Sequence, residues 1–261
     1  MGLGLPSEIL ALLNEKGMID LPLCKEYLTR VKEWLEGRHR DNAKARDLVR
    51  ARSDLIDLLV KRLFETADGQ ARLSFPPLNQ RVALIALGGY GRGELNLYSD
   101  IDLLFLHQWK VTPYVEALSE RIFYTLWDAG LDVGFSTRNI DDCLRVIREN
   151  FTSRTAIIDA RYLTGDSQLY SQFERTIFKD TLYKMASAFV EEKVEAAHQR
   201  HVKYGNSVYL LEPNIKQGEG GLRDIHTARW ICRIKFKANS FEEAVQKGII
   251  TKKELMSLNI S

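Results

Sequence analysis

Two short apolar runs near the middle of the chain predict buried strands, over residues 82–87 and 101–106. Residues 115–129 repeat apolar side chains at helical spacing, and residues 131–137 alternate as a third strand does. Asn139 can cap a helix that follows. The order strand, loop, strand, helix, strand, helix predicts an α+β protein whose α/β-type core holds a small mixed sheet.

Helices are expected before this core. Residues 1–40 suit one or two modest helices. Between residues 42 and 67, leucines recur on one face while arginines occupy the others, which is the pattern of an amphipathic helix. Pro76 and Pro77 then break the chain. The first part of the protein is therefore predicted to be helical up to about residue 75.

The chain is also expected to be helical beyond the core. Residues 152–204 are rich in helix formers and contain no convincing strand. A loop rich in glycine precedes a helix that is expected over 222–237. The predicted domains are an N-terminal helical region, the α/β core and a C-terminal helical domain, over residues 1–75, 76–150 and 151–261.

The composition excludes some classes of protein. The 37 Lys and Arg residues against 35 Asp and Glu give a net charge of +2, which does not support nucleic acid or an anionic membrane as the main partner. The three cysteines lie far apart without a CxxC pair, so neither a disulfide framework nor structural zinc is expected, and a reducing cytoplasm is the natural compartment. No signal peptide or membrane-spanning stretch is recognised.

A pair of aspartates opens the second predicted strand. Asp100 and Asp102 stand two residues apart, so their side chains would point to the same side of a strand. Two converging carboxylates repel each other unless a cation lies between them, and Mg²⁺ binds one or two carboxylates together with phosphate oxygens of a substrate. A lone Asp-x-Asp more often lies in solvent, so the neighbouring residues must support the metal site that the pair predicts.

Glycines after the first predicted strand give that support. Gly88 and Gly89 allow a ligand to approach the backbone closely, and their N–H groups can cradle phosphates. Arg92 can neutralise a phosphate, and Ser99 can donate a hydrogen bond to one. Neither the P-loop pattern nor the dinucleotide-binding pattern is present. Together with the aspartate pair, this segment predicts transfer of a nucleotide.

The Gly-Gly pair, followed after ten residues by Asp-x-Asp, resembles the nucleotidyltransferase superfamily. Downstream segments resemble the bifunctional enzymes that add uridylyl groups to the PII nitrogen-signalling protein and remove them. These segments cover residues 131–138, 159–166 and 199–205, and, with the sequence Leu-Glu-Pro-Asn to Gly-Gly-Leu-Arg-Asp, residues 210–227. The likeness extends over roughly residues 45–250.

This resemblance implies UTP as donor, a tyrosine hydroxyl of PII as acceptor and Mg²⁺ as cofactor. Asp100 and Asp102 take the metal-binding positions, and Gly88 and Gly89 take the positions of the nucleotide loop. Asp132 is expected to be the third carboxylate on the third strand, although it could equally be an exposed aspartate where the strand starts. The implied reaction is attack of the tyrosine oxygen on the α-phosphate of UTP, with release of pyrophosphate.

The downstream loop has two interpretations. Glu212, Asn214, Lys216, Arg223 and Asp224 could lie over the nucleotide or against PII, with Lys216 as a nucleotide-binding residue. Alternatively, the loop packs between the two domains, and Arg223 and Asp224 pair structurally. The sequence leaves both interpretations open.

Full-length members of the family continue into a His-Asp hydrolase domain and small-molecule-sensing domains. This chain has no His-Asp dipeptide and ends soon after a helix start near Thr251, so it is expected to be truncated, without the removal reaction or glutamine sensing. Two alternative functions remain: a transferase that adenylylates a protein such as glutamine synthetase, and a regulatory module that binds nucleotide without turnover.

Overall fold

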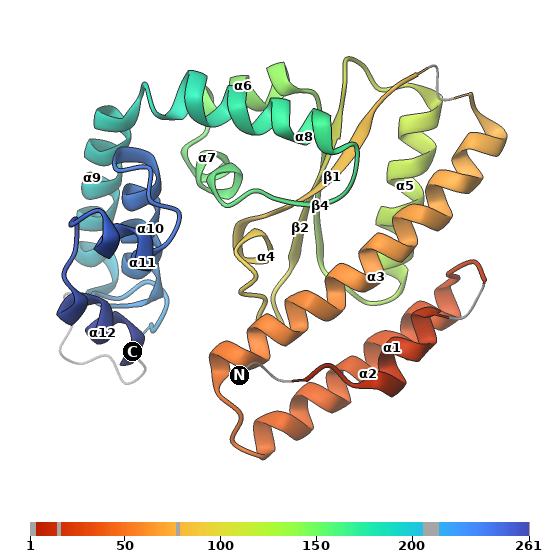
Figure 1. Ribbon diagram of the computed structural model, residues 1–261, viewed down its shortest axis with the longest axis horizontal. Helices are drawn as coiled ribbons and strands as arrows, with labels where there is room; N and C mark the ends of the chain where they lie inside the picture. The colour runs from red at the N-terminus through yellow and green to blue at the C-terminus, as the bar shows by residue number, and fades with distance from the viewer. Residues whose placement is uncertain (1–3, 15–16, 77–78, 206–213, 261) are drawn as a thin grey trace. The chain divides into compact units, whose positions relative to one another are not determined.

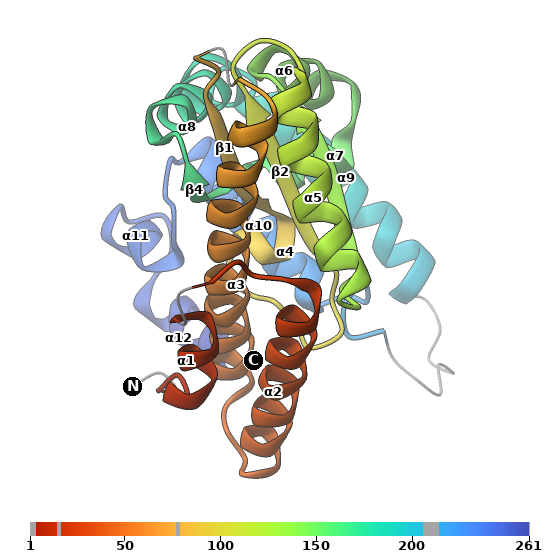
Figure 2. The same cartoon turned by 90° about the vertical axis from the view of Figure 1, so that its right-hand side faces the viewer.

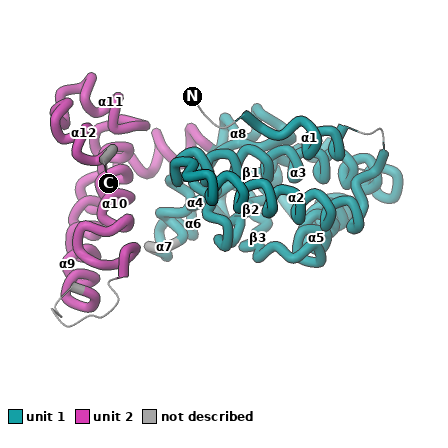
Figure 3. The backbone as a smooth tube through the Cα atoms, turned by 90° about the horizontal axis from the view of Figure 1, so that it is seen from below, with its two compact units in different colours: residues 1–173 teal, residues 174–261 magenta. Residues whose placement is uncertain are grey.

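The computed structural model describes residues 4–14, 17–76, 79–205 and 214–260 (Figure 1). The chain forms two compact units, residues 1–173 and 174–261 (Figure 3). The first holds a four-stranded mixed sheet with its helices, and the described residues of the second form helices and turns. The predicted fold class is therefore confirmed: a small mixed sheet preceded and followed by helices.

The strand order of the sheet is β3-β2-β1-β4. β1 (Val82–Leu87) pairs antiparallel with β2 (Ile101–His107), and β2 pairs parallel with β3 (Val133–Arg138). These three strands were expected and begin within two residues of the predicted positions. β4 (Arg161–Gly165) pairs antiparallel with the other side of β1.

The prediction that no strand follows residue 150 is wrong, because β4 belongs to the sheet. Its five residues are mostly half-buried and carry no continuous apolar run, so pairing with β1 rather than hydrophobic pattern makes them a strand. The boundary between the compact units accordingly falls after residue 173, whereas the sequence placed the start of the helical domain at 151. The further division at residue 75 stays a prediction.

The remaining elements of the first unit are helices, and the longest of them contains the amphipathic pattern seen in the sequence. They are α1 (Ser7–Asn14), α2 (Leu21–Arg40), α3 (Ala45–Ser74), α4 (Gly88–Gly91), α5 (Pro113–Asp128), α6 (Ile140–Glu149), α7 (Phe151–Ile158) and α8 (Ser167–Glu174). Asn139 caps α6 as predicted, since its side chain accepts a hydrogen bond from the Asp142 N–H.

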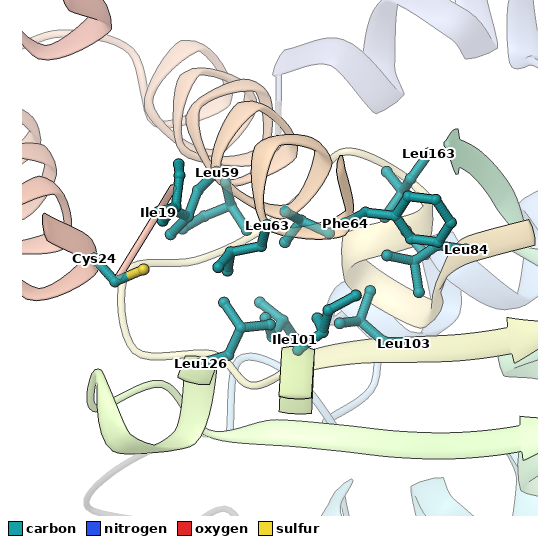
Figure 4. Close-up of a cluster of buried hydrophobic side chains, with 14 of the residues drawn as sticks. Ile19, Cys24, Leu59, Leu63, Phe64, Leu84, Ile101, Leu103, Leu126 and Leu163 are labelled. Carbon is teal, nitrogen blue, oxygen red and sulfur yellow. The ribbon is translucent and has the colours of Figure 1, made fainter. Parts of the chain in front are cut away.

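The core of this unit lies between α3, α5 and one face of the sheet. α3 and α5 lie side by side (Figure 2). Phe64 of α3 lies beside Leu84 of the sheet, and Leu59, Leu63 and Leu103 belong to the same buried cluster (Figure 4). Each such side chain contributes roughly 1.5–3 kcal/mol when it is buried. This packing fixes the sheet against α3, and with it the ends of β1 and β2.

The opposite face of the sheet is also buried. Ala83, Ile85, Leu104 and Leu106, which alternate with the residues of the first face, are fully buried. α6 contacts β3, and α7 contacts β1. Burial on both faces explains why β1 and β2 read as continuous apolar runs instead of alternating ones.

The second unit begins with a π-helical segment, η1 (Arg175–Leu182). Its other described helices are α9 (Ala186–Gly205), α10 (Leu222–Lys235), α11 (Phe241–Gln246) and α12 (Lys252–Ile260). α10 corresponds to the helix expected over 222–237, and it packs against α9. Among the described residues, no helix of either unit has the length and apolarity to cross a membrane.

Candidate active site

A single helical turn follows β1 at the predicted glycine pair. Gly88 opens α4 with a φ of +56°, a backbone conformation that favours glycine. A Cβ atom at position 88 would lie 3.0 Å from the Oδ2 atom of Asp102. The turn therefore brings bare backbone against the side chain that the sequence predicts as a metal ligand.

Asp102 lies between two glycines, Gly88 directly after β1 and Gly134 on β3. Its register partners are Leu87 on β1, the residue before Gly88, and Gly134 on β3. A Cβ atom at position 134 would lie only 2.1 Å from the Oδ1 atom of Asp102, so a larger residue does not fit beside that carboxylate. No role was predicted for Gly134, although a glycine inside an alternating strand is a signal of close approach.

The negative charge of Asp100 acts on the carboxyl of Asp102. Asp102 is half-buried near the start of β2, and Asp100 is exposed just before that strand. Burial raises the pKa of the Asp102 carboxyl, and the negative charge of Asp100 raises this pKa further. The two carboxylates thus form a pair whose repulsion a bound cation would relieve.

Asp132 lies at the start of the neighbouring strand. It is exposed, and its backbone carbonyl accepts a hydrogen bond from the Ile101 N–H at 2.9 Å. Among the residues that the structure describes, no three His, Cys, Asp or Glu side chains gather closely enough to hold a metal ion on their own. A third-carboxylate role for Asp132 stays a prediction.

Arg92 ends the helical turn and is held by two carboxylates. Its Nη1 atom lies 2.6 Å from Asp159 Oδ2 and its Nε atom lies 2.7 Å from Glu94 Oε2, with the guanidinium largely buried. Burial acts to lower the pKa of Arg92, but the charge of Asp159 and the contacts with Glu94 outweigh it, and the pKa is raised. In this arrangement Arg92 anchors the glycine turn, and its predicted contact with a phosphate is untested.

Arg161, on the unpredicted strand β4, holds the turn from another side. Its guanidinium binds Asp57 of α3 through two contacts, Nη1–Oδ2 at 2.5 Å and Nη2–Oδ1 at 3.0 Å. It also donates to the backbone carbonyls of Tyr90 and Gly91, both at 3.1 Å. This pair was not predicted, because 104 residues separate Arg161 from Asp57 and no local pattern marks them.

The other predicted binding residues lie outside this cluster or in the second unit. Ser99 precedes the aspartate pair and is half-buried. Lys216 is exposed in the second unit, in a turn where the Asn214 side chain accepts hydrogen bonds from the backbone N–H groups of Lys216 and Gln217. Glu212, with the start of its motif, lies outside the described residues.

Asp224 of the same motif has a structural partner set within the second unit. It accepts hydrogen bonds from the Gly220 N–H at 2.8 Å and pairs with His201 at 2.9 Å and with Arg200. Burial acts to raise its pKa, but these contacts outweigh burial and lower it. Asp224 therefore joins the 214–221 turn to α9, and the guanidinium of Arg223 lies over the Trp230 ring.

Comparison with known proteins gives two family matches. A model described as a nucleotidyltransferase domain matches residues 70–162, and one described as GlnD PII-uridylyltransferase matches residues 188–261. The bifunctional uridylyltransferase/uridylyl-removing enzyme of Cereibacter sphaeroides is 40% identical over 223 residues, which are 85% of this chain and 24% of that protein. The protein of the same name from Rhodospirillum rubrum is 41% identical over 203 residues, 76% of this chain and 21% of that protein.

The chain belongs to the GlnD PII-uridylyltransferase family. It corresponds to the N-terminal nucleotidyltransferase region of these enzymes and spans about a quarter of the length of the curated relatives it matches. The nucleotidyltransferase match runs from the end of α3 into β4 and so contains the glycine turn and the aspartate pair. The predicted family and enzyme class are confirmed.

Proposed function

We propose that this region transfers UMP from UTP to a tyrosine of a PII protein, with Mg²⁺ as cofactor and pyrophosphate as product. The observation that carries the proposal is the Asp102 carboxylate, held between Gly88 and Gly134 beside Asp100, inside the nucleotidyltransferase match. The uridylyltransferase name of the relatives supports UTP as donor, and the name of the family model supports PII as acceptor.

The donor set at this position fits Mg²⁺. The carboxylate of Asp100 repels that of Asp102. Mg²⁺ ordinarily completes such a site with water and with phosphate oxygens of a substrate. We assign Asp100 and Asp102 as the residues that would hold it. When bound, Mg²⁺ would offset the negative charge on the phosphates during transfer.

The chain itself supplies positioning. The backbone of Gly88 and Gly89 can approach the phosphates because no side chain intervenes, and a first helical turn leaves N–H groups to donate to them. Ser99 is a further proposed contact of the nucleotide. A carboxylate, for which we propose Asp132, would accept the proton of the attacking tyrosine. Orientation and charge stabilisation are the main sources of rate in this chemistry.

The decisive experiment substitutes Asp100 and Asp102 with Asn, separately and together. Incubation with UTP, Mg²⁺ and PII, followed by mass measurement of PII, should show at least a roughly hundredfold loss of transfer for each variant, as for removal of one electrostatic stabiliser. Asp141→Asn, on α6, is the matched control and should transfer normally. A folded double variant that transfers at the rate of the unaltered chain would refute the proposal.

The same assay separates the alternative functions. ATP in place of UTP, with glutamine synthetase as acceptor, tests protein adenylylation. Nucleotide binding that depends on Mg²⁺ but releases no pyrophosphate in the presence of PII indicates a regulatory module.

Cys24, Cys143 and Cys232 are buried and form no disulfide, which suits the reducing cytoplasm that we propose as the compartment.

A further inference from the structure

A basic hollow of about 510 Å³ lies in the first unit, beside the aspartate pair but not formed by it. It opens between α2, α3 and the two segments that lead into β2 and β3. Its wall holds three cationic side chains, Lys25, Lys32 and Arg52, against one carboxylate, Asp132, and Lys32 also pairs with Glu36 on α2 at 3.9 Å. Such an excess of positive charge in a concave surface favours an anionic ligand.

Arg52 is the unusual member of this wall. Arg52 is only 6% exposed, and its Nη1 atom is buried without a hydrogen-bond partner. Its Nη2 atom lies 3.5 Å from the Ser99 carbonyl oxygen, at the limit of a hydrogen bond. Burial lowers the pKa of Arg52 to about 10, so the guanidinium remains charged at neutral pH. A buried charge of this kind ordinarily has a carboxylate or another anion beside it.

Two other buried or partly buried arginines of the same unit have carboxylate partners, and Arg52 has none among the described residues. Arg92 contacts Asp159 and Glu94, and Arg161 contacts Asp57 through both ends of the guanidinium. No ion pair to Arg52 is found within the part of the chain that the structure describes. The counter-charge of this guanidinium is therefore missing from the described protein.

A second hollow, of about 470 Å³, continues the basic surface on the other side of Arg52. The two hollows share Arg52, Leu97 and Tyr98. The second adds His39 and Arg40 against Glu36. Arg52 thus lies in a wall with basic side chains on both sides.

We propose that the hollow at Arg52, Lys25 and Lys32 binds a small molecule that carries a phosphate or carboxylate group. The oxyanion would supply the missing counter-charge, and the apolar side chains of Leu28 and Leu97 in the same wall would contact the remainder of the ligand. Neither Asp100 nor Asp102 lines the hollow, whereas Ser99 and Asp132, which we propose for UMP transfer, do, so the hollow adjoins the proposed transfer site.

The test is calorimetric titration of the whole chain with pyrophosphate in EDTA. We expect one saturable site, and Lys25→Met/Lys32→Met should weaken it at least about tenfold, or roughly 1.4 kcal/mol. Arg30→Met is the matched control: Arg30 lies on the same helix α2, pairs with Glu26 on the surface and does not line the hollow, so binding should be unchanged. Arg52→Met should also weaken binding, and the lysine variant keeps the test valid if Arg52→Met does not fold.

Two further arms identify the location and source of the anion. Asp100→Asn/Asp102→Asn should bind pyrophosphate as the unaltered chain does. Citrate replaces pyrophosphate to test a carboxylate ligand, and UTP is added in EDTA as a competitor. Displacement by UTP assigns the hollow to nucleotide phosphates, and simultaneous binding assigns it to a separate molecule; both support the site. The proposal is overturned if neither anion binds saturably up to about 10 mM, or if the lysine variant binds like the unaltered chain.

Discussion

At the scale of single residues, the carboxylate of Asp102 decides what its neighbours can be. Gly134→Ala would place the methyl carbon only 2.1 Å from Asp102 Oδ1, so the carboxylate would have to move. We expect UMP transfer to fall at least about a hundredfold because misplaced reacting groups lose this much, while the circular dichroism spectrum stays that of the folded chain. Gly37→Ala, where nothing lies within 4 Å of the new atom, should leave transfer unchanged. Equal rates for the two variants would contradict the proposed role of Asp102.

The raised pKa of Asp102 predicts a pH effect on stability. The folded state holds the proton more tightly than the unfolded state, so the carboxyl stabilises the fold at low pH, and this contribution is lost as the pH rises from the ordinary 3.8 through the raised value. Asp102→Asn should therefore unfold at a higher temperature than the unaltered chain at neutral pH in EDTA. Adding Mg²⁺ should raise the unfolding temperature of the unaltered chain but not that of Asp102→Asn. Thermal unfolding across the pH range measures both effects, and identical curves would refute them.

At the scale of elements, the glycine turn α4 depends on Arg92, which ends the turn, and on Arg161, which lies on β4. Asp57→Asn removes the partner of Arg161 and should destabilise the fold by about 3 kcal/mol, the lower end for a broken buried pair since Arg161 is partly exposed. Transfer should fall as well, because Arg161 also holds the Tyr90 and Gly91 carbonyls.

Urea unfolding and the transfer assay measure these two losses. Glu26→Gln breaks the exposed Arg30 pair of α2 and is the control, with an expected change below about 1 kcal/mol. If the two variants lose the same stability, the Asp57 pair does not hold the turn.

The long helix α3 offers the opposite change. Gly69 lies exposed within it, and a Cβ atom there would meet nothing within 4 Å. Gly69→Ala should stabilise the protein by about 0.5–1 kcal/mol, because alanine loses less backbone entropy in a helix. Urea unfolding measures the gain, and a loss of stability would show that α3 does not continue through residue 69.

At the scale of the whole molecule, β4 determines where the first unit ends. A chain of residues 1–173 keeps the sheet and the Arg161 contact, and we expect it to fold with one cooperative transition in urea. A chain of residues 1–150, cut at the boundary that the sequence suggested, loses β4, leaves the edge of β1 unpaired and removes Asp159 from Arg92. It should aggregate or unfold without cooperativity; equal stability of the two fragments would contradict this boundary.

The sequence by itself determined the parts whose signal is local. The apolar runs of β1 and β2, the cap at Asn139 and the amphipathic pattern of α3 follow from side-chain spacing along the chain. The aspartate pair and the glycine turn were visible for the same reason, since Gly88 and Asp102 lie within one strand–turn–strand segment.

Only the tertiary structure decided which distant residues meet. β4 is a strand because β1 has an open edge, and Arg161 reaches Asp57 and the glycine turn only once that pairing exists. Gly134 acquires its role from the register of β3 on β2, which no local pattern specifies. Arg52 likewise reads in the sequence as one more arginine of an amphipathic helix, and only the fold buries it beside a hollow without a counter-charge.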